Sequence, residues 1–441
     1  MEIPKVTIIG AGLAGTEAAW QAALRGASVR LFEMRPHKPT PVHRTDGFAE
    51  LVCSNSLRSN DLTNAHGLLK EEMRRLGSLV IEAAEASRVP AGQALAVDRD
   101  LFSRNITERL EASPAIEILR EEIPAIPEDG IVIVATGPLT SDALAASIHD
   151  FTGSDYLYFY DAVSPVIEVE TIDFDKAFRA SRYGKGGDDY ITCPMTRKEY
   201  GVFYEALIAA STIELHEIDK GLYFEGCLPV EVMAARGVDT LRFGPMKPVG
   251  LVDPRTQKES YAVVQLRQDN FAATLYNIVG FQNQLKWGEQ KRVLRLIPGL
   301  EQAEFARYGM IHRNTYINAP SILKPSFQTE RRDNLFFAGQ ISGVEGYTES
   351  AASGLMAGRN AAALALGEPI EVPPPETALG ALSHYIAYAD AESYQPTNIT
   401  FGLLPPMNPP VKNRRARRQA MVERALSEID AFIAHRDVVT S

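Results

Sequence analysis

A glycine-rich turn near the N-terminus constrains the fold of this 441-residue chain more than any other feature. Residues 5–12 have a buried-strand pattern, residues 15–25 have the small side chains of a closely packed helix, and residues 28–33 form a second strand pattern. The turn between the first strand and the helix consists of Gly10, Ala11, Gly12, Leu13, Ala14 and Gly15. This order is the opening βαβ unit of a dinucleotide-binding fold. The sequence therefore predicts an α/β domain with a parallel, helix-covered sheet.

Each glycine of this turn has its own physical role. Gly10 permits the tight turn, Gly12 lets the backbone approach a pyrophosphate, and Gly15 lets the helix pack closely on the strand. The helix N-terminus adds free amides and a partial positive charge. Glu33 ends the second strand, where its carboxylate can accept hydrogen bonds from ribose hydroxyls and disfavours a 2′-phosphate. We predict that the turn and Glu33 bind the adenosine part of a dinucleotide.

Two later strand ends indicate which dinucleotide binds. An apolar strand over 131–135 leads into Gly137, and a second one over 334–338 leads into Gly339. Both ends resemble signatures of two-dinucleotide-fold flavoproteins, in which the chain meets the flavin at these points. Many of those proteins have Asp where this chain has Gln340, which disfavours a generic disulfide reductase. We expect bound FAD, in contact with Gly137 and Gly339.

The stretch from Gly343 to Gly354 is the most distinctive in the chain, with four glycines in twelve residues beside a strand end. Such spacing is typical of close backbone approach to a ligand. We expect Gly343 and Tyr347 to contact the cofactor. Tyr347 either stacks on an aromatic ring or packs in the ordinary way.

The pattern of elements divides the chain into four parts. We assign residues 1–160 to the first part of an FAD-binding domain and residues 161–300 to an inserted α+β domain. Residues 301–370 return to the FAD-binding domain, and residues 371–441 form a helical C-terminal tail with a basic cluster. Within the first part, residues 66–87 have apolar side chains at helical spacing, and Asp98 is a candidate N-cap for a helix that reaches about Ala112.

The three cysteines, Cys53, Cys193 and Cys227, are too few and too far apart for a disulfide framework or a C-x-x-C zinc site. We expect no metal. Cys53 and Cys227 lie in loop-like stretches with polar or glycine neighbours, which are compatible with either an inert or a reactive thiol. Cys193 is at a strand end, where packing is the expected role.

Charge and hydropathy limit the partners of the chain. No run approaches 18 apolar residues, and no signal sequence precedes the first strand, so we expect a cytoplasmic protein without a membrane partner. The formal net charge of −11 argues weakly against nucleic acid. The run from Lys412 to Arg418 is locally basic, and it is either a solvated tail or a phosphate-binding patch.

With these motifs together, the chain resembles the folate- and FAD-dependent tRNA (uracil-5-)-methyltransferases, the TrmFO family, from Val6 to about Pro406. The stretches that carry the resemblance are Gly10–Gly15, Glu50–Ser56, Ala91–Arg99, Glu225–Glu231, Arg242–Leu251 and Gly343–Gly354. The Phe-Gly-Pro-Met-Lys-Pro-Val-Gly-Leu and Cys-Ser-Asn-Ser strings are far more specific than the glycine turn.

The resemblance implies a reaction and its participants. Methylenetetrahydrofolate donates one carbon, reduced FAD carries it and supplies reducing equivalents, and NAD(P)H is the external reductant. The product is 5-methyluridine at position 54 in the T loop of tRNA, so the T arm is the expected partner. Cys227 and Cys53 match the two functional cysteines of the family, and we assign Cys227 the attack on uracil C6. The sequence leaves the reverse assignment open, and also the oligomeric state.

Three other functions compete with this one. The related wobble-uridine tRNA modification flavoproteins share the fold and a similar glycine-rich helix, but they are longer and have a substantial helical domain at the C-terminus. A small-molecule flavin oxidoreductase is compatible with the FAD signatures alone. A flavoprotein that only binds or folds tRNA has no need of Cys53 and Cys227.

Overall fold

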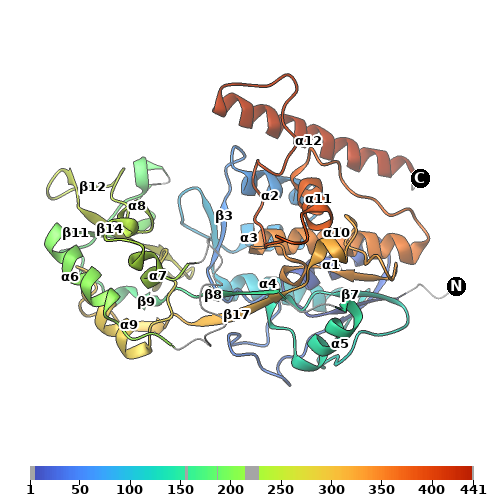
Figure 1. Ribbon diagram of the computed structural model, residues 1–441, viewed down its shortest axis with the longest axis horizontal. Helices are drawn as coiled ribbons and strands as arrows, with labels where there is room; N and C mark the ends of the chain where they lie inside the picture. The colour runs from blue at the N-terminus through green and yellow to red at the C-terminus, as the bar shows by residue number, and fades with distance from the viewer. Residues whose placement is uncertain (1–4, 154–156, 186, 214–227, 440–441) are drawn as a thin grey trace.

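The computed structural model describes residues 5–153, 157–185, 187–213 and 228–439, and its two largest sheets lie side by side (Figure 1). One sheet is parallel and is covered by most of the helices. The other is antiparallel and has its own smaller set of helices. Each sheet encloses its own hydrophobic core.

The parallel sheet has five strands in the order β18-β7-β1-β2-β6. Their bounds are Lys5–Ile9 for β1, Ser28–Phe32 for β2, Ile116–Leu119 for β6, Ile131–Val134 for β7 and Leu335–Phe337 for β18. All four pairings are parallel, and β18 joins the sheet from a segment about two hundred residues after β7. The predicted Rossmann-like fold class is confirmed, and the sheet is built from distant parts of the chain.

Two helices cross this sheet with their backbones in close contact, namely α1 (Leu13–Leu24) and α10 (Tyr347–Leu366). A Cβ atom placed on Gly354 would lie 2.1 Å from the carbonyl oxygen of Ala14, and one on Gly358 would lie 2.3 Å from that of Ala18. Glycine is therefore required at both positions of α10. This contact fixes the middle of α10 against the first half of α1.

The helical spacing over residues 66–87 corresponds to two helices, α2 (Ala65–Arg75) and α3 (Leu79–Ala86). The break is at Gly77, whose φ of 72° ends the first helix in a left-handed turn. Asp98 caps α4 (Arg99–Glu111) as predicted, because its side chain accepts a hydrogen bond from the amide of Leu101. A small three-stranded sheet lies beside these helices and contains β3 (Ser56–Ser59), β4 (Arg88–Val89) and β5 (Ala94–Val97). After β7, the helix α5 covers Asp142–Thr152.

The antiparallel sheet has the strand order β10-β11-β14-β15-β9-β16. Its strands are β9 (Val166–Glu168), β10 (Phe178–Arg179), β11 (Tyr190–Met195), β14 (Ala262–Gln268), β15 (Leu275–Ile278) and β16 (Phe305–Arg307). Its helices are α6 (Arg197–Ile208), α7 (Val230–Ala235), α8 (Thr240–Phe243) and α9 (Trp287–Leu294), and a separate hairpin pairs β12 (Val252–Asp253) with β13 (Lys258–Glu259). The edge strand β16 follows residue 300, so the chain adds this last strand to the antiparallel sheet before it returns to the parallel sheet at β18.

The chain passes between the two sheets along a two-stranded ladder. β8 (Leu157–Ala162) leaves the parallel sheet, and β17 (Ile311–Tyr316) returns to it, paired antiparallel over their full length. Figure 1 shows this ladder between the two halves of the molecule.

Two C-terminal helices pack on the helical layer over the parallel sheet, α11 (Ala378–Tyr388) and α12 (Arg414–Val439). The buried carboxylate of Glu72 accepts hydrogen bonds of 2.8 Å from the amides of Ala378 and Leu379 and so caps α11. Burial raises the pKa of Glu72 to about 8, although these two amides oppose the shift. Of the helices in the described ranges, none is both long and apolar enough to cross a membrane.

Candidate functional site

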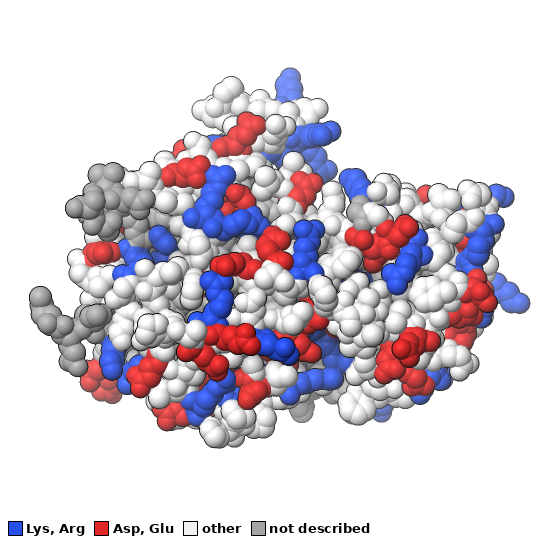
Figure 2. Space-filling view, turned by 180° about the vertical axis from the view of Figure 1, so that it is seen from behind, with Lys and Arg blue, Asp and Glu red and all other residues white. Residues whose placement is uncertain are grey.

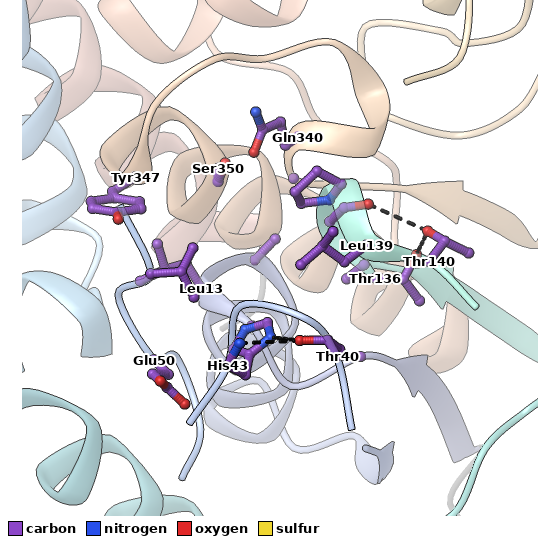
Figure 3. Close-up of a pocket in the computed structure, with 18 of the residues that line it drawn as sticks. Leu13, Thr40, His43, Glu50, Thr136, Leu139, Thr140, Gln340, Tyr347 and Ser350 are labelled. Carbon is purple, nitrogen blue, oxygen red and sulfur yellow. Dashed lines mark hydrogen bonds between the residues drawn. The ribbon is translucent and has the colours of Figure 1, made fainter. Parts of the chain in front are cut away.

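A cavity of about 450 Å³ opens at the carboxyl ends of the parallel strands. Its walls include residues that directly follow strands, where open α/β sheets bind ligands. Figure 3 shows Leu13 and Tyr347 on one side of this space, with Thr136 and Thr140 across from them and His43 below.

The glycine turn has the shape that a pyrophosphate needs. A Cβ atom on Gly12 would meet nothing within 4 Å, so the space in front of this residue is open cavity. Gly12 is also the N-cap of α1 and provides no side-chain cap. The first amides of α1 have no helical carbonyl to pair with, and they are available to an anion. This half of the cavity therefore fits the phosphates of a dinucleotide.

Glu33 lines the same cavity and also stabilises the turn. One carboxylate oxygen accepts a 3.0 Å hydrogen bond from the amide of Ala11, and the other accepts two from the amide and Nε of Arg35, both 3.0 Å. Burial by itself raises the pKa of Glu33, but the hydrogen bonds and charge of Arg35 outweigh burial and lower it overall. The ionised carboxylate keeps lone pairs for ribose hydroxyls.

The structure brings most of the predicted cofactor residues together, with three exceptions. The cavity is lined by Gly10, Gly12, Leu13, Ala14, Glu33, Gly137, Gly339 and Tyr347. Ala11 and Gly15 lie behind the turn, and a Cβ on Gly15 would come 1.8 Å from the carbonyl oxygen of Gly10. Gly343 has a φ of 81° and packs against Tyr394, so it too lies outside the cavity lining.

The half-buried Cys53 lies in the cavity wall beside Tyr347. The Tyr347 hydroxyl accepts hydrogen bonds from the amides of Cys53 at 2.7 Å and of Ser54 at 3.1 Å. Burial and the neighbouring Cys53 raise the pKa of Tyr347 well above its ordinary value, so the phenol stays neutral. The first residue of α10 thus holds the loop that carries a thiol.

Three arginines from distant segments surround that loop. Arg99 donates to the carbonyl of Leu51 at 2.7 Å and pairs with Asp269 at 3.0 Å. Arg267 of β14 donates to Asn55 Oδ1 and Ser54 Oγ, each at 3.0 Å. Among the described contacts, Asp269 is the one carboxylate paired with these arginines. Its single negative charge does not balance their positive charge. The Cys53 loop is therefore held by a residue of α4 and a residue of β14.

Arg307 of β16 is the third arginine, and it donates to the carbonyl of Val52 at 3.5 Å. Burial and the charge of Arg99 lower the pKa of Arg307 to about 10. Its Nη2 has no hydrogen-bond partner within the part of the chain that the structure describes. Neither Arg267 nor Arg307 belongs to a recognisable motif, so the sequence does not single them out, and only the fold brings them to Cys53.

The other two cysteines differ from Cys53. Cys193 is buried in β11, and burial raises the pKa of its thiol to about 12, which makes it an inert packing residue. Cys227 lies outside the described residues, so its assignment as nucleophile stays a prediction.

Comparisons with known proteins show the family of this chain. A sequence model of the family described as "Glucose inhibited division protein A" matches residues 5–369. The chain is 61% identical over 427 residues to "Methylenetetrahydrofolate--tRNA-(uracil-5-)-methyltransferase TrmFO" of Pelotomaculum thermopropionicum, which covers 97% of this chain and 98% of that protein. The protein of the same name from Brevibacillus brevis is 58% identical and covers 99% of this chain and 100% of its own length.

The fold also has a relative among solved structures. GidA from Aquifex aeolicus, in its form II crystal, superposes with a TM-score of 0.70 over 97% of this chain and 73% of that chain. The identity is 18%, so this likeness concerns the fold alone. The family resemblance drawn from the motifs is confirmed by the high identity over nearly the whole length. The chain belongs to the glucose inhibited division protein A family and, with the relatives above, to its TrmFO members.

Proposed function

We propose that this protein methylates C5 of the uridine at position 54 in the T loop of tRNA and so produces 5-methyluridine. Methylenetetrahydrofolate donates the carbon, FAD is the cofactor, and NAD(P)H is the external reductant. The observation that carries the proposal is identity of about 60% to TrmFO proteins over nearly the full chain. The cavity supports the proposal, because its lining includes both Cys53 and the glycine turn that fits a dinucleotide.

Bound FAD supplies the carrier for the one-carbon unit and the reducing equivalents. The protein supplies position and charge. The Gly10–Gly15 turn and the start of α1 bind the pyrophosphate, and Glu33 binds the ribose. Gly137 and Gly339 let the backbone of two strand ends approach the cofactor closely.

The thiols meet a need of the uracil ring. C5 is a poor nucleophile until a thiolate adds at C6 and makes C5 enolate-like, and a base must later remove the C5 proton so that the thiolate can leave. We assign the attack on C6 to Cys227. Cys53, which lies in the cavity wall, removes the C5 proton or protects the one-carbon unit.

The reaction is tested with T-arm RNA, methylenetetrahydrofolate, FAD and NAD(P)H, followed by nuclease digestion and mass spectrometry. We expect 5-methyluridine at position 54 and none when cytidine replaces that uridine. RNA with tritium at uracil C5 should release its label during the reaction. A small-molecule oxidoreductase would release none, and that result would refute the proposed function.

The thiol assignment is tested with T-arm RNA that contains 5-fluorouridine at position 54, because fluorine cannot leave C5 as the proton does and the covalent adduct persists. We expect the RNA on the peptide that contains Cys227, both in wild type and in Cys53→Ala. Cys53→Ala and Cys227→Ala should each keep FAD and lose most methylation, whereas Cys193→Ala is the matched control and should keep both. RNA found on Cys53 would reverse the two roles, and RNA on neither thiol would exclude the covalent mechanism.

A further inference from the structure

Three aromatic rings form a stack on the antiparallel half of the molecule. The Tyr308 ring lies between Phe305 of β16, at 5.2 Å and 18° between planes, and Trp287, at 5.9 Å and 16°. Trp287 begins α9 and is the outermost ring, with 62% of its surface exposed. A Cβ atom on the adjacent Gly288 would meet nothing within 4 Å. The stack is thus fixed at its inner end and exposed at Trp287.

The segment that leads to Trp287 is bonded to both flanks of the stretch that carries Cys227. On one flank, the amide of Ile213 donates to the carbonyl of Gln284 at 2.9 Å. On the other, the amide of Val230 donates to the carbonyl of Gln282 at 2.8 Å. The side chain of Glu231 strengthens this flank by accepting a 2.9 Å hydrogen bond from the amide of Gln284. Ile213 and Val230, the described residues on the two sides of that stretch, therefore both lie beside residues 282–284.

The same stack is connected to the cavity and to the Cys53 loop. Gln282 lines the cavity, and five residues of extended chain place Trp287 within about 17 Å of it. Arg307, between the two inner rings in sequence, donates to the carbonyl of Val52 next to Cys53. Trp287 is thus linked through residues 282–286 to the cavity, and its stack is linked through Arg307 to the Cys53 loop.

The charge around the stack differs from that of the whole protein. Residues 286–308 contain five Lys or Arg side chains and three Glu, although the formal net charge of the chain is −11. Glu289 and Glu304 are both engaged by Arg or Lys neighbours. Lys286, directly before Trp287, is exposed. An exposed cation next to an open aromatic ring suits a phosphate that adjoins an unstacked base.

We propose that Trp287 is the platform on which an unpaired base of the RNA substrate stacks, with Lys286 next to the adjoining phosphate. Sequence-tolerant recognition of single-stranded loops uses aromatic faces of this kind together with cations. A buried structural tryptophan would instead have both faces covered. This inference rests on the proposed function, because it assumes that tRNA is the substrate.

The binding test measures the affinity of wild type, Trp287→Ala and Trp287→Phe for T-arm RNA. Wild type should bind this RNA with an affinity that falls as the salt concentration rises. Loss of a stacked base weakens binding about 5- to 150-fold, so Trp287→Ala should fall in that range and Trp287→Phe between it and wild type. Tyr388→Ala on α11 is the matched control, because that ring is 70% exposed and lies on the other half of the molecule. FAD absorbance and flavin reduction by NAD(P)H should be unchanged in all three.

A second readout uses fluorescence, since the chain has two tryptophans. In Trp20→Phe the only indole is Trp287, and stacking of a base should quench its emission as RNA is added. Equal affinity of Trp287→Ala and wild type, or an indole that RNA leaves unquenched, would overturn the platform. A Trp287→Ala protein that instead changes its sedimentation without any loss of RNA affinity would assign this face to a second copy of the chain. Wild type that fails to bind T-arm RNA at all would refute the proposed function.

Discussion

Gly12 and Gly15 are three residues apart in one turn, yet different neighbours require each of them to be glycine. A Cβ on Gly15 would collide with the Gly10 carbonyl oxygen at 1.8 Å, so the fold itself requires glycine there. A Cβ on Gly12 would enter open cavity, and its φ of −75° suits any residue. The protein tolerates a side chain at Gly12, whereas a bound pyrophosphate does not.

This difference predicts separable effects of two substitutions. The Gly12→Asn apoprotein should have the melting temperature of the wild-type apoprotein, because Asn is a preferred N-cap, but its side chain fills the pyrophosphate space and occupies the first amides of α1. FAD affinity should fall roughly 100-fold or more, measured by titration of the apoprotein with FAD. Gly15→Ala should instead lose about 1–3 kcal/mol of unfolding free energy. Flavin bands of wild-type strength in purified Gly12→Asn would contradict the assigned role.

At the scale of elements, β14 connects the second sheet to the thiol loop of the first. Arg267 near its end reaches Ser54 and Asn55, while the Asn55 side-chain amide donates 2.8 Å to the carbonyl of Gln268 on the same strand. The two hydrogen bonds of Arg267 have a charged donor, and hydrogen bonds of this class contribute most when made and cost most when broken. The strand therefore holds the position of Cys53 relative to the cavity.

Arg267→Lys tests this contact because it preserves the charge but removes the fork that bonds two side chains at once. We expect methylation to slow about 10- to 100-fold, the equivalent of one charged hydrogen bond removed. FAD should remain bound through the turn and Glu33, although Arg267 also lines the cavity. Alkylation of Cys53 by iodoacetamide should change rate as the loop loosens. Arg179→Lys, in the same sheet with its guanidinium on Tyr276, is the control and should keep full activity.

At the scale of the whole molecule, the net charge is acidic, but the basic side chains are distributed unevenly over the surface. Figure 2 shows basic and acidic side chains interspersed over the rear face, with Lys and Arg gathered at the top, where α12 lies in Figure 1. The basic run enters α12 at Arg414, and Asn413 accepts hydrogen bonds from the amides of Arg415 and Ala416. Most of these side chains are exposed, as counterion release on phosphate binding requires.

Replacing Arg414, Arg415, Arg417 and Arg418 by Ala should therefore weaken RNA binding in a salt-dependent way. For each phosphate that the variant no longer neutralises, the slope of log affinity against log salt should become shallower by roughly 0.7–0.9. Binding curves at several salt concentrations measure this slope, and flavin content confirms that the variant is folded. Identical slopes in variant and wild type would make the run a solvated tail.

The sequence by itself determined the parts of this protein that depend on local order. The glycine turn, Glu33 and the strand ends at Gly137 and Gly339 follow from spacing along the chain, because strand periodicity and turn stereochemistry act over a few residues. The Asp98 cap followed for the same reason. The family motifs also identified Cys53, which the structure places in the cavity wall.

Only the tertiary structure decided which distant residues meet. Arg99, Arg267 and Arg307 come from three separate segments, and nothing in their local sequence marks them as partners of the Cys53 loop. The stack that ends at Trp287 likewise requires β16 and α9 to be side by side. Gly343, although it stands in the most distinctive motif, packs on Tyr394, whereas Glu345 and Gly346 of the same loop line the cavity. Such contacts depend on how two sheets are placed against each other, and local spacing along the chain does not encode that placement.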